Sequence, residues 1–203
     1  NRTQAVAEEA LALGIVDSIS ESDLKKADIV IFCTPEKGNL AFIQHKLSLL
    51  KKDALLTDIA GVKNHFAQEV QALLPEGMDF ISGHPMCGRE GAGLAQADGA
   101  IFDGANYVVI RQKENKKDHI QRIIDMAKAL GCQHVPVVTA DAHDRAIAYT
   151  SDLTHVVATS LIHSESYNKD TKYFMGGSFR DMTRVADING KLWTSLFLQN
   201  QQK

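Results

Sequence analysis

One histidine in this chain stands where a general base would be expected. His84 follows a short apolar run at residues 80–82 that is typical of a buried strand ending. Pro85 comes next, and a residue before proline is confined to extended backbone. We therefore expect His84 to be held stiffly just past the carboxyl end of a strand, where open α/β sheets place ligand chemistry. The alternative interpretation is a strand, a turn and a partly buried structural histidine.

Glycines and a cysteine surround this histidine. Gly88, Gly91 and Gly93 follow it and would let the chain pass close to a ligand without side-chain obstruction. Cys87 lies three residues after His84, so a thiol–imidazole nucleophile is an alternative. Both side chains would share one tight turn without a third group to orient them, which disfavours that pair.

A metal-binding module is a further alternative of a different class. It would use His84 with Cys87, and Cys132 with His134. Zinc sites prefer close ligand pairs such as CxxC with a matching second pair, and these two pairs lie about 45 residues apart on different elements. The spacing therefore predicts no metal site.

Composition places the chain among ordinary globular proteins. Its 203 residues are 44% hydrophobic and 23% charged, with a net charge of -3. This balance argues against a general nucleic-acid or anionic-membrane partner. No signal peptide is visible in these residues, and no apolar run approaches the roughly 18 residues of a membrane span. Three cysteines without a CxxC pair fit a reducing cytoplasm.

Alternating short apolar runs and amphipathic stretches predict the fold class. Continuous apolar runs indicate parallel strands buried on both faces, and apolar residues at helical spacing indicate the helices between them. This order favours a Rossmann-like, doubly wound, mostly parallel α/β sheet. Strands are expected at 28–34, 54–58, 80–82, 106–111 and 135–138.

The pattern changes near residue 139. Residues 140–166 contain neither proline nor glycine and carry one apolar stripe, which predicts a single long helix. Residues 176–200 also look helical. No GxGxxG phosphate loop is present, so we expect an internal fragment of a longer protein, beginning just after the second strand of a nucleotide-binding domain.

Four blocks together resemble the prephenate/arogenate dehydrogenase family of tyrosine biosynthesis, and they span nearly the whole chain. They are TDIAGVK (57–63), GHPMCGREGAG (83–93), TSDLTHVVA (150–158) and GGSFRDMTRVA (176–186), followed by Trp193. The resemblance implies a partial nucleotide-binding domain at 1–139 and a partial helical dimerisation domain at 140–203, which meet at the active site of a homodimer.

The resemblance also implies an activity. Prephenate would be oxidatively decarboxylated to 4-hydroxyphenylpyruvate, with hydride transfer to NAD and with His84 as the partner of the ring hydroxyl. Arogenate, which differs in an amino group and would yield tyrosine, is the alternative substrate. A related β-hydroxyacid or imine reductase is a second alternative, but its catalytic lysine on the interdomain helix has no counterpart in 140–166.

Substrate-binding residues follow from the same resemblance. Arg184 matches the family's carboxylate-binding arginine, since guanidinium recognises a carboxylate bidentately, and Asp181 would orient it. An ordinary surface pair between these two residues is the simpler interpretation. His155 matches a family histidine, although a core histidine would serve equally well on a long helix. Gly177 and Trp193 complete the substrate set.

The cofactor residues are placed at strand ends. Thr34, Pro35, Asp58 and Gly61 are assigned to dinucleotide contact, and Arg2 lies where a 2′-phosphate would be read. NAD is the family default, with NADP as the alternative.

Three positions depart from the family pattern. Gly61 replaces a serine that orients the substrate hydroxyl and the histidine, Asp152 replaces a histidine or glutamine, and Thr154 replaces a proline. The departures leave the assignment of His84 intact and weaken any statement on substrate side-chain preference.

Overall fold

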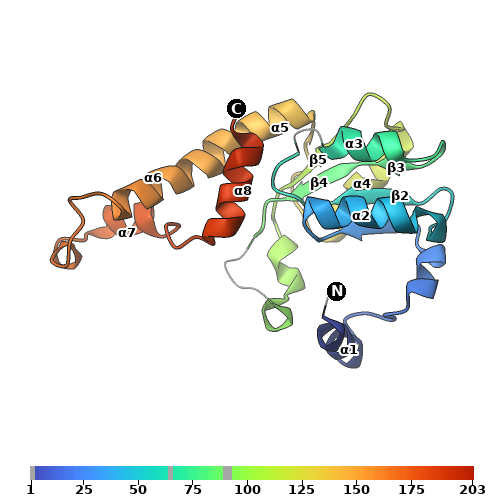
Figure 1. Ribbon diagram of the computed structural model, residues 1–203, viewed down its shortest axis with the longest axis horizontal. Coiled ribbons are helices and arrows are strands. Elements are labelled where there is room, and N and C mark those ends of the chain that lie inside the picture. The colour runs from blue at the N-terminus through green and yellow to red at the C-terminus, as the bar shows by residue number, and fades with distance from the viewer. Residues whose placement is uncertain (1–2, 64–65, 89–92) are drawn as a thin grey trace. The chain divides into compact units, whose positions relative to one another are not determined.

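The computed structural model describes residues 3–63, 66–88 and 93–203. These residues form two compact units (Figure 1): a sheet unit, with residues 3–60 and 66–139, and a helical unit, with residues 61–63 and 140–203. Residues 61–63 pack with the helical unit, although the sequence places them in the first domain. None of the helices in the described ranges has the length and apolar composition that a membrane crossing needs.

Three parallel strands begin the sheet unit. After helix α1 (Gln4–Ala12), strands β1 (Ile29–Phe32), β2 (Leu55–Asp58) and β3 (Asp79–Phe80) pair in the order β1-β2-β3. Helices α2 (Glu36–Lys46) and α3 (Phe66–Leu73) connect them. The apolar faces of these helices pack on one face of the strands, with Ile43, Val70, Leu56 and Phe80 at the centre of the core.

Three further strands complete the unit. Strand β4 (Ser82–Pro85) pairs antiparallel with β5 (Tyr107–Ile110), which pairs in parallel with β6 (Val137–Val138). Helix α4 (Lys117–Ala129) lies on the opposite face from α2 and α3, since its Ile123 packs with Leu55 while the neighbouring Leu56 faces the other core. Figure 1 shows this layering.

The prediction of a doubly wound α/β sheet is confirmed. Short 3-10 helices lie at Glu21–Lys26, Leu47–Leu49, Leu94–Gln96 and Gly99–Phe102.

Two strand predictions need correction. His84 was expected just past a strand, but it lies inside β4 and is paired with Val108. The extended backbone that proline imposes on His84 also suits a strand, and β5 supplies a partner that the local sequence cannot reveal. In addition, β1 is not buried on both faces: Ile31 is 45% exposed, and in the described part of the chain β1 has a strand on one side only.

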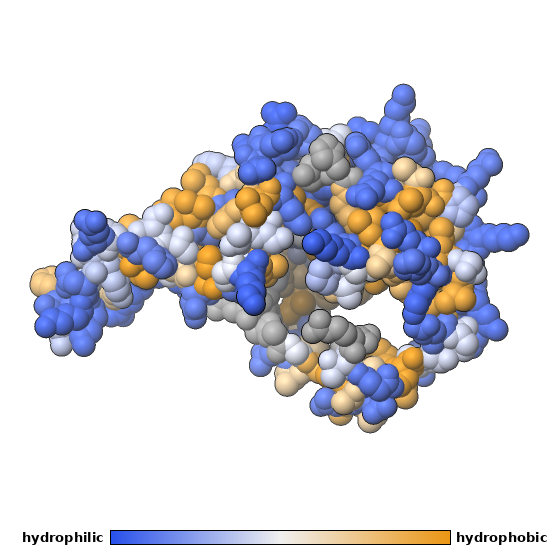
Figure 2. All heavy atoms as spheres, in the orientation of Figure 1, coloured by the Kyte–Doolittle hydropathy of each residue, from blue (hydrophilic) through white to orange (hydrophobic). Residues whose placement is uncertain are grey.

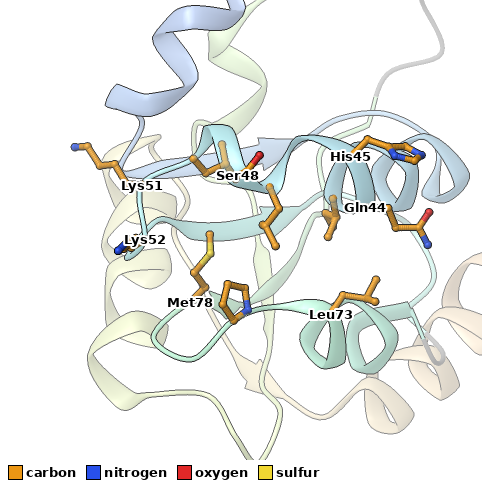
Figure 3. A pocket seen from close by; sticks show the side chains of 11 residues that line it. Gln44, His45, Ser48, Lys51, Lys52, Leu73 and Met78 are labelled. Atoms are coloured by element: carbon orange, nitrogen blue, oxygen red, sulfur yellow. The ribbon is translucent and has the colours of Figure 1, made fainter.

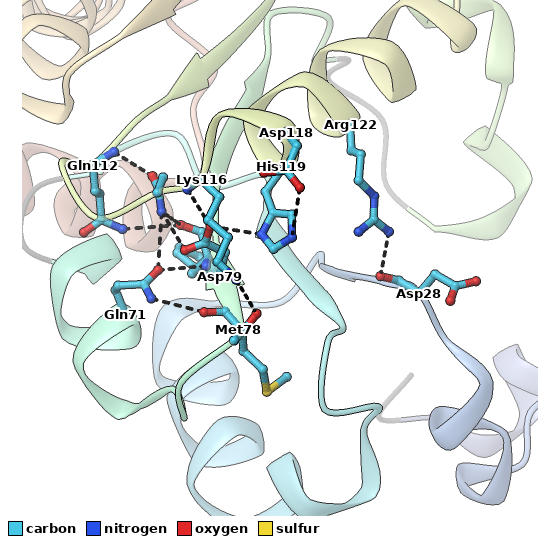
Figure 4. A network of polar contacts seen from close by, with 12 residues as sticks. Asp28, Gln71, Met78, Asp79, Gln112, Lys116, Asp118, His119 and Arg122 are labelled. Carbon is cyan, nitrogen blue, oxygen red and sulfur yellow. Dashed lines mark hydrogen bonds and ion pairs between the residues drawn. The ribbon is translucent and has the colours of Figure 1, made fainter.

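A buried carboxylate joins β3 to the start of α4 (Figure 4). Asp79 is 2% exposed and accepts hydrogen bonds from the backbone nitrogen of Lys116 at 2.9 Å and from Asn115 Nδ2 at 3.3 Å. His119 Nδ1 lies 3.0 Å from the same carboxylate. These contacts compensate part of the cost of burying a charge.

The helical unit differs from the expected single helix over 140–166. Helix α5 (Ala140–Ile147) runs through a π-helical turn (Ala148–Asp152) into α6 (Leu153–Ile162), which ends earlier than expected. In and beside the turn, the hydroxyls of Thr150 and Thr154 donate to the carbonyls of Ala146 and Ser151. Such bonds perturb regular helical geometry. A 3-10 helix (Thr171–Tyr173), α7 (Gly177–Thr183) and α8 (Gly190–Asn200) complete the unit.

Burial of Tyr107 predicts a pH-dependent stability. Its side chain is 2% exposed, and desolvation raises its pKa to about 12 from an ordinary value of 10.0. Between these values the folded state holds a proton that the unfolded state has lost, so the free energy of unfolding falls as pH rises. We expect Tyr107→Phe to remove up to about 3 kcal/mol of this fall. Urea denaturation at pH 9 to 12 measures it, with the exposed Tyr173→Phe as control; equal slopes for wild type and Tyr107→Phe would contradict the prediction.

Candidate active site

Several predicted site residues lie at the carboxyl ends of the strands in the sheet unit. Parallel strands present these ends along one edge, and Phe32 at the end of β1 pairs with Asp58 at the end of β2. Thr34 and Pro35 follow β1, are exposed, and lead into α2, with Pro35 as its N-cap residue. His84 is half-buried in β4. The sheet unit therefore brings these predicted residues to one edge.

Asp58 lies in this edge but is fully buried. Its Oδ1 accepts a hydrogen bond from the Ser82 hydroxyl and one from the Gly83 backbone nitrogen at 3.3 Å. Its Oδ2 accepts from the Ala60 backbone nitrogen at 3.2 Å. With 0% exposure, the carboxylate bonds inward to its own chain. Its assignment to cofactor contact stays a prediction.

The ring of Tyr107 leaves no room for a side chain at Gly83. A Cβ at this position would lie 2.3 Å from Tyr107 Oη and 2.7 Å from Tyr107 Cε1. Because Tyr107 is buried on β5, its ring cannot move aside without disturbing the core. The backbone before His84 is thus confined from the side of β5 as well as from Asp58.

Asn39 is a polar residue at this edge that sequence reasoning missed. It lies in the first turns of α2, is 0% exposed, and its side chain contacts the Thr34 hydroxyl. Its Nδ2 has no hydrogen-bond partner among the described residues. A buried amide with one unpaired end beside a strand terminus fits a polar ligand such as a dinucleotide. Its position in the first turn of the helix that follows the strand was the available signal.

The alternative chemistries gain no support from the geometry. Desolvation raises the pKa of the Cys87 thiol, which disfavours the thiolate that a nucleophile needs. Within the described ranges, no three His, Cys, Asp or Glu side chains are arranged to hold a metal ion.

In the helical unit, two of the predicted substrate residues touch. The rings of His155 on α6 and Trp193 on α8 stack with centroids 3.6 Å apart and planes at 28°. His155 Nδ1 lies 2.9 Å from the Ser151 carbonyl oxygen. In the neutral ring, Nδ1 therefore carries the proton and Nε2 is the acceptor.

The other predicted substrate residues belong to α7 and the residue that follows it. Gly177 begins α7, Asp181 lies within it, and Arg184 follows its last residue; all three are exposed. Gly61 lies beside α8, where an added Cβ would be 3.8 Å from Leu196 Cδ2. Arg2 lies outside the described residues.

A buried polar cluster in the helical unit was also missed by the sequence analysis. Lys63, His143 and Asp144 are at most 3% exposed. Asp144 Oδ1 accepts from the Lys63 backbone nitrogen at 2.9 Å and lies 2.7 Å from His143 Nδ1. Asn200 Nδ2 donates to the Asp144 carbonyl at 3.0 Å and to Asp152 Oδ2 at 2.8 Å. The cluster ties residues 61–63 and the end of α8 to α5, so Asp152 has a structural partner.

A cavity of about 710 Å³ lies elsewhere in the sheet unit (Figure 3). It is lined by the ends of α2 and α3 and by residues before β2 and β3, including Ser48, Lys52, Leu73 and Met78. These segments lead into the amino ends of the strands, opposite the edge that carries His84. The residues that line it include none of the predicted site residues, so we do not assign the chemistry to it.

A doubly wound sheet with polar side chains at its carboxyl edge, together with a helical unit, defines the class of nucleotide-binding dehydrogenase folds. The chain belongs to the prephenate dehydrogenase family. Residues 1–135 match the family's nucleotide-binding domain and residues 139–203 its dimerization domain.

Individual relatives agree with this family. The chain is 29% identical to prephenate dehydrogenase of Bacillus subtilis over 98% of its own length and 55% of that protein's length. The structure of Synechocystis arogenate dehydrogenase superposes with a TM-score of 0.84 at 28% identity, covering 99% of this chain and 74% of that one. The structure of prephenate dehydrogenase from A. aeolicus, in complex with hydroxyphenyl propionate and NAD+, superposes with a TM-score of 0.82 at 25% identity. The match covers 96% of this chain and 70% of that one.

The Gly83 contact predicts a strict size limit. We expect Gly83→Ala to lower the free energy of unfolding by about 1–3 kcal/mol, because the added methyl collides with the buried Tyr107 ring. Gly88→Ala is the matched control, since no atom of the described residues lies within 4 Å of an added Cβ there. Chemical denaturation of both variants measures the difference. A Gly83→Ala protein as stable as Gly88→Ala would show that the ring does not confine this strand.

Proposed function

We propose that the whole protein oxidatively decarboxylates prephenate to 4-hydroxyphenylpyruvate, with hydride transfer to NAD. The supporting observation is His84, half-buried on a strand held from both sides at the carboxyl edge of the sheet. Arogenate is the second candidate substrate, supported by the likeness to the Synechocystis enzyme. The two substrates differ only in a keto or amino group on the side chain.

The residues of this chain suit each step. His84 accepts the proton of the ring hydroxyl as hydride leaves the same carbon, which becomes a ketone. Loss of the ring carboxylate as carbon dioxide then leaves its electron pair in the ring, and the proton returns to the oxygen to give the phenol. No net proton is released. Arg184, with Asp181 and Gly177 nearby in the sequence, binds a substrate carboxylate, and the His155–Trp193 stack contacts the substrate.

The cofactor proposal rests on the edge of the sheet. When bound, NAD supplies a nicotinamide ring that accepts hydride. Thr34, Pro35 and the unpaired amide end of Asn39 would hold the dinucleotide, with Gly61 and Arg2 as further predicted contacts. NAD is preferred because the A. aeolicus relative was solved with NAD+, and NADP remains the alternative.

We further propose a homodimer formed through a helical domain at 140–203, with a nucleotide-binding domain at 1–139. The match to a dimerization domain supports this assembly. So do the large apolar side chains that are exposed in the helical unit, among them Phe174, Met182 and Leu198. Figure 2 shows apolar areas on one face of this unit. A cytoplasmic location agrees with three free cysteines.

Arg184 is expected to bind substrate rather than stabilise the fold, because it is exposed at the end of α7. Arg184→Gln should raise the KM for the substrate about 10- to 150-fold, because the variant loses a hydrogen bond to a charged group. The KM for NAD should not change. Arg180→Gln, on the same short helix and also exposed, is the control. A normal substrate KM with a lowered Tm would assign Arg184 to the fold instead.

The activity itself is tested by steady-state kinetics of the full-length protein with prephenate or arogenate and with NAD or NADP. We expect substrate-dependent NADH formation, reduced about 10²- to 10⁴-fold in His84→Asn, the range for loss of a general base, with little change in Tm. His45→Asn, a histidine that lines the distant cavity, is the control.

Two results would contradict the proposal. Absence of NADH or NADPH formation with both substrates would exclude the activity. Near-normal turnover in His84→Asn would remove His84 from the chemistry.

A further inference from the structure

The carboxylate of Asp58 is bonded to the two residues that directly precede His84. Ser82 donates through its hydroxyl and Gly83 through its backbone nitrogen, both to Oδ1. The other oxygen accepts from the Ala60 backbone nitrogen. One side chain at the end of β2 therefore connects the loop that follows β2 with the strand that carries the proposed base.

A carboxylate is chemically suited to this connection. Its two oxygens are acceptors only, and the Ala60, Ser82 and Gly83 groups that bond it among the described residues are all donors. An asparagine of the same shape would turn an NH₂ group toward at least one of these donors. Because Asp58 is 0% exposed, water cannot relieve the mismatch. The site therefore selects a carboxylate over its neutral isostere.

The opposite side of the same segment is equally constrained. In the ladder with β5, Gly83 pairs with Val109 and His84 with Val108. The Tyr107 ring lies where a Gly83 side chain would be. With β5 on one side and the Asp58 carboxylate on the other, the backbone of His84 has little freedom. Since a 1 Å displacement of a reacting group can cost about 10²-fold in rate, these contacts bear directly on turnover.

We propose that Asp58 is a positioning residue that places the His84 imidazole through Ser82 and Gly83, rather than a contact to the cofactor. The inference rests on the proposed function of His84 as the base. It assigns to Asp58 an effect on kcat that is separate from dinucleotide affinity.

The sheet unit offers a matched control in Asp79. It too is a buried carboxylate that accepts from a backbone nitrogen and from side chains, but its bonds go to Asn115, Lys116 and His119 at the start of α4. Neutralising Asp79 also disturbs a buried network, but it removes none of the bonds that Asp58 makes to Ser82 and Gly83.

The test compares Asp58→Asn, Asp79→Asn and Ser82→Ala in the full-length protein. The readouts are Tm, kcat, KM for substrate and NAD, and the imidazole Cε1–Hε1 NMR signal of His84, identified by its loss in His84→Asn. Asp58→Asn should lower kcat about 10- to 100-fold, shift the His84 signal and leave the KM for NAD unchanged. Asp79→Asn should lower Tm while leaving kcat and the His84 signal as in wild type.

Other outcomes would overturn the inference. An unshifted His84 signal in Asp58→Asn, with a raised KM for NAD, would make Asp58 a cofactor contact. If Asp58→Asn fails to fold, Ser82→Ala decides: it should shift the His84 signal and lower kcat about 2- to 10-fold, and an unchanged signal would refute the inference. If the wild-type protein oxidises neither substrate, the proposed function fails, whereas the NMR comparison still reports whether Asp58 positions His84.

Discussion

The buried carboxylate of Asp58 is the interaction on which the edge of the sheet depends. Removing a carboxylate from water costs several kcal/mol, and only well-placed donors offset that cost. Here the donors come from the loop after β2 and from β4, segments that share no long ladder. The charge thus specifies how the chain passes from a parallel group of strands to an antiparallel pair.

A second buried carboxylate, Asp79, anchors the other end of the β3–β4 segment. It joins β3 to the first turn of α4, so that this helix packs on the face opposite α2 and α3. Between the two carboxylates, the Ile81 backbone nitrogen donates to the Leu56 carbonyl at 2.9 Å and keeps β2 beside the segment. His84 therefore extends from one of the best-anchored stretches of the unit.

The helical unit organises its polar groups differently. The π-helical turn and the bond from His155 Nδ1 to Ser151 orient the imidazole, and Trp193 covers one of its faces. Asp144 and Asn200 hold the neighbouring elements in place through buried hydrogen bonds. The stacked rings give this part of the unit a partly aromatic character, which agrees with the proposed role of His155 and Trp193 in contacting the substrate.

The sequence by itself determined the element types and the chemistry-bearing residues. Apolar periodicity is a local property, so the strands, the main helices and the change in pattern near residue 139 could be read directly. The resemblance to the dehydrogenase family, which the comparisons confirm, rested on four short blocks in order.

Tertiary structure alone decided which residues are neighbours. The antiparallel partner of β4, the Tyr107 ring against Gly83, the unpaired amide of Asn39 and the π turn inside the long helix all depend on contacts between distant segments. For the same reason Asp58 could be recognised as a strand-end carboxylate from the sequence, whereas its inward bonds to Ser82 and Gly83 became visible only when β2 and β4 lay side by side.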